Sequence, residues 1–416
     1  MEKSITIIGK GIVGSFAAYS AKEKGYKVTI VDNGKGGTKQ FSGILDIAGL
    51  PWLPLNERLN KNISENCEMT GKHFKSHVYS QYTGKTIYSF LKNILTNSPF
   101  NEFLSEVSVK NRLYLTYDGR VHTGGVSWQS VIPIPENEKL GFIGIENLSN
   151  FNTELSIENF NKTLKKIKLK SSFSSSKEIR INNGYNLDII EINRLTDTSD
   201  KIIKVLAENI KKIDADTVFI PPILGIIKWR ENLAFLEKEC GKKISETPIA
   251  FGSPFGLRLQ HELSKFLNDI EIYKDTVNGF KIEKGKISSI YLKSGKHLSS
   301  NIFLLTTGKF LSGGLERDTN WRETIFKLPL FFENKVIPGE QDIYKLFGES
   351  FFDHHKIWCL GVKTDKEGKT IDNSYTVFAD NLYSAGGIIE GNNYQISGTG
   401  IGGSLFTLRK LRWLNE

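Results

Sequence analysis

The chain is poor in cysteine and has no long apolar run. Its 416 residues include three cysteines, Cys67, Cys240 and Cys359, which lie far apart and form no CxxC pair. This spacing argues against an iron–sulfur cluster or a structural zinc site and fits a reducing compartment. The longest apolar run, 218–227, is interrupted by two prolines and falls short of the ~18 residues that a membrane span needs. Because a strand pattern begins at residue 4, we expect no signal peptide, and we expect any membrane contact to be peripheral.

Arginine is also scarce, which bears on the positive charge of the chain. Lys and Arg number 55 against 46 acidic residues, a net charge of +9, but only 11 of the 55 are Arg. The densest basic run, 162–170, alternates with Leu and Ile rather than with aromatic residues, whereas a nucleic-acid groove tends to combine Arg clusters with aromatics. The pattern favours a lysine-rich surface that faces partner proteins or an anionic membrane.

Glycine, by contrast, is abundant, with 38 residues that show no collagen-like period. The first cluster follows an apolar strand at residues 4–8 and has the GxGxxG spacing, with Gly9, Gly11 and Gly14. A helix and a second strand come next, and the second strand ends at Asp32. This order of strand, glycine turn, helix, strand and acid is the signature of a site for an adenine dinucleotide, NAD or FAD.

Each residue of this unit has a physical role in such a site. Gly9 permits the tight turn, Gly11 lets the backbone approach a pyrophosphate, and Gly14 lets helix and strand pack closely. The helix N-terminus offers free N–H groups to the phosphates. Asp32 can accept hydrogen bonds from both ribose hydroxyls, which disfavours a 2′-phosphate.

Two further glycine clusters complete the predicted cofactor site. A strand at 301–306 leads into Thr307 and Gly308, and glycines of the C-terminal region open a final helix predicted over 404–414. The positive end of that helix would stabilise negative charge on a reduced flavin. A Ser–Gly loop at 42–43 is typical of flavoproteins. The predicted cofactor-binding residues are Gly9, Gly11, Gly14, Asp32, Ser42, Gly43, Thr307, Gly308, Gly386, Gly387, Gly400, Gly402 and Gly403.

The remaining pattern predicts an α/β fold with an insertion. Between the glycine clusters we expect strands at 139–145, 187–192 and 217–221, helices at 153–167 and 199–213, and a Ser-rich loop at 171–176. After them we expect a helix at 256–267 and a three-stranded meander at 271–273, 277–282 and 287–292. We therefore predict a discontinuous Rossmann-like FAD/NAD(P)-binding domain with a β-meander, residues 1–135 plus 245–416, and an inserted α/β cap domain, residues 136–244.

Motifs spread along the whole chain resemble those of one family. They include GKGIVG near the N-terminus, FSGILD at 41–46, PPILGI at 221–226, GSPFGLRLQHEL at 252–263, LLTTGKFLSGGL at 304–315, GVKTD at 361–365 and the final NLYSAGG…GTGIGGSL. Together they are similar to the B subunit of the anaerobic glycerol-3-phosphate dehydrogenase, within the fumarate-reductase-like flavoproteins.

This resemblance implies one component of a membrane-associated complex. The complex would oxidise sn-glycerol 3-phosphate to dihydroxyacetone phosphate and pass electrons to quinone, at the inner, cytoplasmic face of the cell membrane. Its partners would be an FAD-containing catalytic A subunit and an iron–sulfur C subunit. The family implies FMN in this chain, whereas the glycine motif and Asp32 favour FAD, because FMN has no adenosine ribose. FAD and FMN are therefore both kept as hypotheses.

Oxidation of a secondary alcohol by a flavin needs a base for the hydroxyl proton, and a phosphorylated substrate needs Arg or Lys. The candidates for these catalytic roles are Arg258, Lys309, Arg317, His354 and His355, with Arg322 and His122 as further possibilities. His73 and His77 have the i, i+4 spacing of metal ligands, but no third ligand accompanies them, so we predict no metal site.

Three alternatives accompany this hypothesis. The chain could be a stand-alone oxidoreductase resembling fumarate reductase or ketosteroid dehydrogenase, which would turn over without partners. It could relay electrons between partner proteins without touching substrate. The positive charge motivates an alternative of another class, an RNA-binding flavoprotein, which predicts binding that weakens steeply with salt.

Overall fold

A five-stranded parallel sheet forms the centre of the computed structural model, which describes residues 3–146, 148–149, 151–167, 170–181, 186–249, 252–338, 342–350, 353 and 355–415. In spatial order its strands are β11 (Glu271–Tyr273), β2 (Lys27–Val31), β1 (Ser4–Ile8), β15 (Ile302–Leu305) and β20 (Leu382–Ser384). Numbered by appearance within this sheet, the order is 3-2-1-4-5, that of a Rossmann-like fold. The predicted fold class is therefore confirmed.

Both faces of this sheet are covered, which explains its nearly continuous apolar strands. Ile7 and Leu304 belong to the core that packs with α1 (Ile12–Glu23) and α9 (Pro254–Phe266). Their neighbours Ile8 and Leu305 point to the opposite face and join a second core with the meander. This alternation follows from the two-residue period of a strand.

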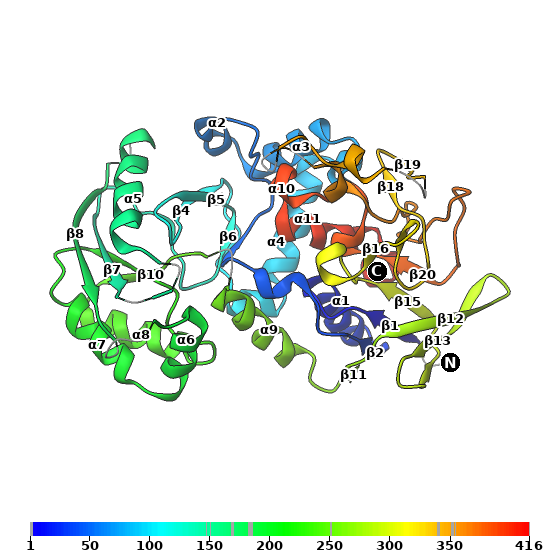
Figure 1. Cartoon of the computed structure of the whole chain (residues 1–416), viewed down its shortest axis with the longest axis horizontal. Helices are drawn as coiled ribbons and strands as arrows, with labels where there is room; N and C mark the ends of the chain where they lie inside the picture. Colours follow the sequence, from blue (N-terminus) through cyan, green and yellow to red (C-terminus); the bar gives the residue numbers. More distant parts are fainter. Residues whose placement is uncertain are drawn as a thin grey trace.

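A four-stranded parallel sheet forms the lobe at the left of Figure 1. Its order is β10 (Lys243–Glu246), β9 (Thr217–Ile220), β7 (Lys139–Ile145) and β8 (Ser172–Ile179). Its helices are α5 (Thr153–Ile167), α6 (Ile189–Thr198), α7 (Lys201–Ile210) and α8 (Trp229–Cys240). All these elements lie between residues 139 and 246, and the division of the chain into domains at 136 and 244 stays a prediction.

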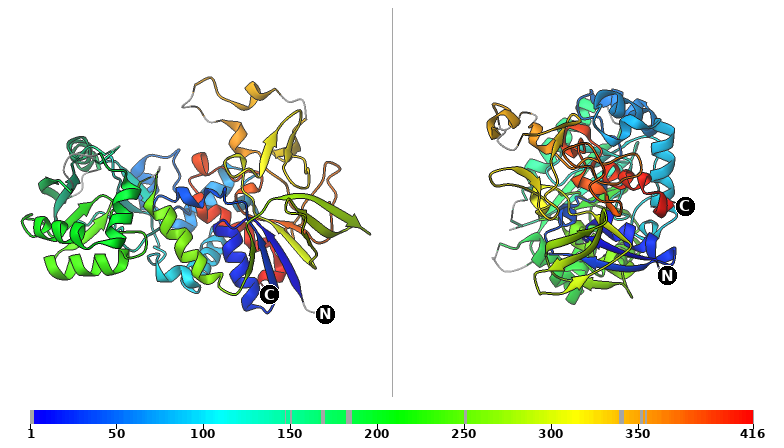
Figure 2. Two further views of the ribbon diagram at one scale, coloured as in Figure 1. Left: turned by 60° about the horizontal axis from the view of Figure 1, so that its bottom comes forward. Right: turned by 90° about the vertical axis from the view of Figure 1, so that its right-hand side faces the viewer.

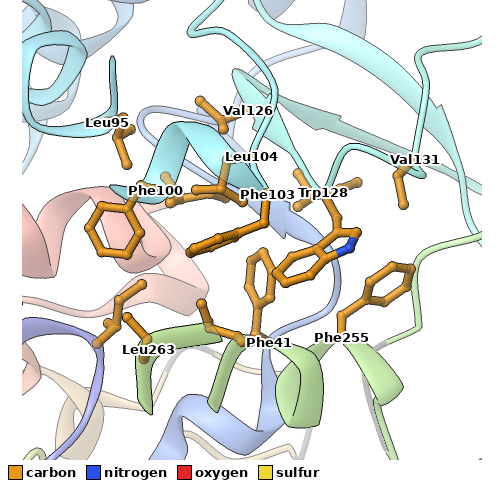
Figure 3. Packing of buried hydrophobic residues seen from close by; sticks show 14 of the residues in the cluster. Phe41, Leu95, Phe100, Phe103, Leu104, Val126, Trp128, Val131, Phe255 and Leu263 are labelled. Atoms are coloured by element: carbon orange, nitrogen blue, oxygen red, sulfur yellow. The ribbon is translucent and has the colours of Figure 1, made fainter. Parts of the chain in front are cut away.

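Buried aromatic residues pack together in the core, and Figure 3 shows Phe41, Phe103, Trp128 and Phe255 among them. The ring centroid of Trp128 lies 5.0 Å from that of Phe103 and 6.3 Å from those of Phe41 and Phe255. The ring centroid of Trp128 also lies 5.2 Å from that of Trp229 of α8. Large buried rings such as these supply much of the apolar area that holds the two lobes together.

The chain from 44 to 127 adds elements that the sequence analysis did not assign. Its helices are α2 (Leu55–Asn60), α3 (Ile63–His73) and α4 (Gly84–Thr96). Its strands pair as two short antiparallel ladders, β4 (Arg112–Leu115) with β5 (Val121–Gly124) and β3 (Ile44–Leu45) with β6 (Val126–Ser127). No helix of the described residues is long and apolar enough to cross a membrane.

The expected meander is wrong in its first strand. Residues Glu271–Tyr273 pair in parallel with β2 and form the edge of the central sheet. The antiparallel meander consists instead of β12 (Val277–Glu283), β13 (Lys286–Leu292) and β14 (His297–Leu298). Figure 2 shows the hairpin of β12 and β13 extending away from the central sheet.

Three other local predictions are wrong. The expected strand at 187–192 is largely the first half of α6, because Asp188 and Glu191 form a capping box that starts a helix. All but the first residue of the expected Ser-rich loop at 171–176 belong to β8 (Ser172–Ile179). The single final helix expected over 404–414 is α11 (Gly400–Phe406), a 3₁₀ turn and α12 (Arg412–Asn415).

Candidate functional site

A cavity of about 890 Å³ opens at the carboxyl ends of the central strands. Its wall includes Gly9 after β1, Asp32 after β2, Thr306 after β15 and Gly386 after β20. The order of the sheet reverses between β1 and β15, and ligands of open α/β sheets bind at such a point. The volume lies within the range of about 300–1,000 Å³ that is usual for ligand sites.

Most of the predicted cofactor residues converge on this central cavity, although they come from segments far apart in the sequence. Those in its wall are Gly9, Gly11, Asp32, Ser42, Thr307, Gly308, Gly386, Gly387 and Gly400. Among the predicted catalytic residues, Lys309 also lies there. Gly14, Gly43, Gly402 and Gly403 lie outside the wall.

The glycine turn after β1 is as tight as its sequence suggests. Gly9 has a φ of +108°, and a Cβ there would lie 2.7 Å from the carbonyl oxygen of Thr306. A Cβ on Gly14 would lie 2.0 Å from the carbonyl oxygen of Gly9, so Gly14 lets α1 pack on the turn. A Cβ on Gly11 would meet only the hydroxyl of Thr38, at 3.4 Å. The space before the N-terminus of α1 is therefore open to a ligand.

Asp32 is held at the end of β2 by two backbone amides. Its Oδ1 accepts a hydrogen bond from Lys10 N at 3.1 Å, and its Oδ2 accepts one from Gly34 N at 3.2 Å. It borders both the central cavity and a pocket of about 470 Å³ that reaches Lys274. This placement gives a carboxylate acceptor and adjoining space for the adenosine half of a dinucleotide, so the residues present fit FAD.

The glycines outside the wall allow neighbouring segments of the chain to pack closely against the residues that form the wall. Gly43 has a φ of +100°, and a Cβ there would lie 2.9 Å from the ring of Phe255. A Cβ on Gly402 would lie 2.6 Å from the carbonyl oxygen of Asp46. These glycines let the 42–47 segment lie against α9 and α11, which places Ser42 and Asp46 in the wall.

Two polar side chains of the wall have unsatisfied oxygens. Among the described residues, no hydrogen-bond partner is found for Thr307 Oγ1 or for Asn392 Oδ1. Asn392 is 4% exposed, and its amide nitrogen donates to Ser404 Oγ at 3.1 Å. Buried oxygens without partners are rare, and a ligand that offers N–H or O–H groups would satisfy them. A flavin ring and its ribityl chain carry such donors.

Lys309 follows the turn after β15 and enters the wall beside Trp358. Its Nζ donates a hydrogen bond to the carbonyl oxygen of Trp358 at 2.7 Å. Burial lowers the pKa of Lys309 to about 7, against the opposing influence of Cys359 and Glu390. Burial also lowers the pKa of nearby His77 to about 3, and the charge of Lys309 adds to that shift. The wall thus carries an amine that can gain or lose a proton near neutral pH.

Arg258 and Arg317, two other catalytic candidates, lie outside the wall. Arg258 is fully buried, and its guanidinium pairs with Glu246 and donates to the carbonyl oxygen of Gly225 at 2.7 Å. It therefore fastens α9 to the four-stranded sheet. Arg317 lies over the ring of Trp321, 5.3 Å from its centroid.

Arg322 and His355 also lie outside the wall. Arg322 pairs with Glu316 at 2.9 Å. The Nδ1 of His355 accepts a hydrogen bond from Gly348 N at 3.0 Å. His354 lies outside the described residues.

His73 and His77 do not converge on a common point. The ring of His73 stacks on Trp52, with centroids 4.7 Å apart. His77 is fully buried, its Nδ1 accepts from Tyr79 N at 3.1 Å, and its Nε2 lies 3.2 Å from Thr399 Oγ1. No group of three or more metal-ligating side chains is found in the part of the chain that the structure describes.

One pair at the cavity was not assigned from the sequence. Asp46 lies in the wall, and its Oδ1 is 2.8 Å from Nε2 of His122. The carboxylate of Asp46 raises the pKa of His122, whereas burial and the charge of Arg58 oppose the shift. The sequence analysis named His122 only as a further catalytic candidate, and the sequence carries no signal for its pairing with a residue 76 positions earlier.

The fold and the cavity define the class of protein. The strand order, the glycine turn with Asp32 and the convergence of three glycine clusters are features of a flavin-dependent oxidoreductase. The prediction of a flavin cofactor is confirmed.

Comparison with known proteins finds sequence similarity to two proteins of one name over nearly the whole chain. The chain is 24% identical over 432 residues to the B subunit of anaerobic glycerol-3-phosphate dehydrogenase from Aliivibrio fischeri, covering 95% of this chain and 91% of that protein. It is 23% identical over 446 residues to the protein of the same name from Mannheimia succiniciproducens, covering 99% and 97%. The resemblance predicted from the motifs is confirmed.

Two other matches cover this chain to different extents. The model of a family described as glucose inhibited division protein A matches residues 255–321. The crystal structure of 3-ketosteroid delta1-dehydrogenase from Sterolibacterium denitrificans covers 99% of this chain and 98% of its own, with a TM-score of 0.38 and 11% identity.

Proposed function

We propose that this chain is the FAD-holding B subunit of a glycerol-3-phosphate:quinone oxidoreductase. The complex oxidises sn-glycerol 3-phosphate to dihydroxyacetone phosphate and passes the electrons to quinone. Similarity to proteins of that name over nearly the whole chain supports the assignment of substrate and complex. The single observation that carries the cofactor proposal is the cavity that joins Asp32 to the glycine clusters.

We assign FAD rather than FMN because of Asp32. Its carboxylate borders the pocket that leads away from the glycine turn, and it would accept hydrogen bonds from the ribose hydroxyls of FAD. Gly9, Gly11 and the N-terminus of α1 would hold the pyrophosphate, since this turn leaves room for close approach of the backbone. The oxygens of Thr307 and Asn392 would accept hydrogen bonds from the flavin end. When bound, the flavin supplies the acceptor for a hydride.

Lys309 has an electrostatic role in this proposal. A reduced flavin carries negative charge, and a lysine in the cavity wall can take up a proton to balance it, because its pKa lies at about 7. Lys309 lies 2.7 Å from the carbonyl oxygen of Trp358, which fixes the amine at one place in the wall. The residue therefore favours the reduced state of the cofactor.

The partners in this proposal are an FAD-containing catalytic A subunit and an iron–sulfur C subunit. The present chain contains no CxxC pair, so a cluster for single-electron transfer has to come from another chain. The complex lies at the inner face of the cell membrane and makes peripheral contact with it. The proposed domains are 1–135 plus 245–416 for the flavin and 136–244 for the cap.

The test is to purify this chain together with the proteins that accompany it from its native source. We expect an FAD protein and an iron–sulfur protein to co-purify, with reduction of a soluble quinone that depends on glycerol 3-phosphate. A complex reassembled without this chain should lose quinone reduction. Full activity without this chain would contradict the proposal, as would turnover of fumarate or an enone by the isolated chain.

A further inference from the structure

The pair of Asp46 and His122 lies at the wall of the central cavity. Asp46 directly follows β3, and its side chain is part of the cavity wall with 22% of its surface exposed. His122 lies in β5, and 43% of its side chain is exposed. The Nε2 of His122 lies 2.8 Å from Asp46 Oδ1, within hydrogen-bonding distance. The two side chains thus form a continuous hydrogen-bonded path of one carboxylate and one imidazole.

Asp46 is held in place by the backbone around it. Its carbonyl oxygen accepts a hydrogen bond from Gly402 N at 3.0 Å. A Cβ on Gly400 would lie 3.1 Å from the Asp46 Cβ, and one on Gly124 would lie 3.5 Å from Asp46 Oδ1. Small residues on both sides therefore leave room for the carboxylate to point at His122. An acid and a base that are already held at hydrogen-bonding distance transfer a proton more readily than a pair whose side chains must first rotate into position.

The charges around the pair keep it able to exchange protons. The carboxylate of Asp46 raises the pKa of His122, and the guanidinium of Arg58 in α2 opposes that shift. Tyr114 of β4 faces the same carboxylate and has a pKa raised by its own burial, so it stays protonated. The charge of Arg112, also of β4, opposes the rise in the pKa of Tyr114.

We propose that Asp46 and His122 form the route by which protons pass between the flavin cavity and solvent. Reoxidation of a two-electron-reduced, singly protonated flavin sends two electrons to the acceptor and releases one proton. Asp46 accepts that proton in the cavity and passes it to the unprotonated Nε2 of a neutral His122 whose own proton is on Nδ1, and the resulting imidazolium releases the Nδ1 proton to water. The route rests on the proposed function in needing a bound flavin, but it does not depend on glycerol 3-phosphate as the substrate.

Other titratable groups near the cavity are placed less well for this task. His77 is fully buried and bonded at both ring nitrogens. The amine of Lys309 donates to the carbonyl oxygen of Trp358. Among the described residues named here, the imidazole of His122 combines contact with a wall carboxylate and substantial exposure to solvent.

The experiment follows proton release during reoxidation of the flavin. The flavin-loaded chain is photoreduced and mixed with ferricyanide in a stopped-flow instrument that contains a pH-indicator dye. Asp46→Asn and His122→Gln should each slow proton release at least tenfold, while their absorption spectra show bound flavin. The matched control is His297→Gln, because the ring of His297 is exposed on β14, with its centroid 4.6 Å from that of Tyr291. This control should release protons at the rate of the unmodified chain.

A second variant separates proton transfer from a structural role. In His122→Ala, added imidazole should restore proton release in proportion to its concentration, because the site of the missing ring is open to solvent. Release in Asp46→Asn and His122→Gln within twofold of the unmodified chain would overturn the proposal. Slow release in His122→Ala that imidazole does not restore would also overturn it, as would a chain that binds no flavin.

Discussion

Lys309 shows how burial changes the chemistry of one residue. The unfolded chain keeps this amine protonated up to its ordinary pKa of 10.5, whereas the folded chain releases the proton near pH 7. Between these values the unfolded state binds more protons, so the contribution of Lys309 to folding becomes more favourable as pH rises. Below pH 7 both states are protonated and the burial of charge costs the most stability.

We therefore predict that Lys309→Met stabilises the cofactor-free chain at pH 6 and has less effect at pH 9. The difference in thermal midpoint between variant and unmodified chain should be at least about 2 °C at pH 6 and shrink with rising pH. The measurement is thermal unfolding across this range. Lys24→Met, at an exposed position, is the control and should show no such trend. An equal effect of Lys309→Met at both pH values would contradict the burial of this charge.

Asp32 is the residue that distinguishes the two flavins. Asp32→Asn keeps the shape of the side chain but removes its charge, and hydrogen bonds to charged groups contribute about 1.5–3 kcal/mol. We expect FAD binding to weaken by roughly 10–150-fold, with little change for FMN, which has no adenosine ribose. Flavin fluorescence titration measures both affinities. Asp269→Asn, whose side chain is 86% exposed, should leave both unchanged, and equal losses for FAD and FMN would argue against the assigned role.

At the scale of an element, the contact between α1 and the turn after β1 depends on Gly14. A Cβ at this position would lie 2.0 Å from the backbone oxygen of Gly9, which cannot move aside as a flexible side chain can. We predict that Gly14→Ala destabilises the chain by about 1–3 kcal/mol and weakens flavin binding. The control is Gly37→Ala, because a Cβ there meets nothing within 4 Å. Denaturant unfolding tests both, and equal stability of the two variants would refute the packing argument.

The elements near the N-terminus could be predicted because their signals are local. The strand Ser4–Ile8, the glycine turn and the strand that ends at Val31 are set by apolar runs and by the spacing of glycines. Pairing between distant strands has no such signal. The strand Glu271–Tyr273 looks like part of a meander until the structure shows it beside β2, more than 240 residues earlier in the chain. The capping box at Asp188 is a local signal for the start of a helix, but the apolar residues that follow it led to the prediction of a strand.

In the candidate site, too, some residues could be predicted from a local motif, and others are brought together only by the fold. The glycines and Asp32 belong to a motif, so their place at the cavity could be predicted from spacing. Asp46 and His122 meet only because β3 and β5 lie side by side with the C-terminal glycines, and nothing in either segment encodes that meeting. Arg258 resembled a ligand for phosphate, yet its charge is balanced by Glu246 in the interior.

At the scale of the whole molecule, Arg258 joins the four-stranded lobe to the rest of the chain. Both Arg258 and Glu246 are fully buried, so removal of one charge leaves the other unpaired in the interior. We predict that Arg258→Met destabilises the protein by about 3–5 kcal/mol. The matched substitution Arg317→Met lies at an exposed residue and should cost far less. Unfolding monitored by tryptophan fluorescence compares them, and a similar small loss in both would contradict a structural role for the buried pair.

We infer that the folded chain binds one FAD in the central cavity. Acid denaturation of the purified protein releases any bound flavin, and chromatography then identifies and counts it. We predict FAD at about one molecule per chain, because the site described above extends from the flavin end to a carboxylate placed for the adenosine ribose. Release of FMN alone, or a chain that binds neither flavin after incubation with both, would contradict this account.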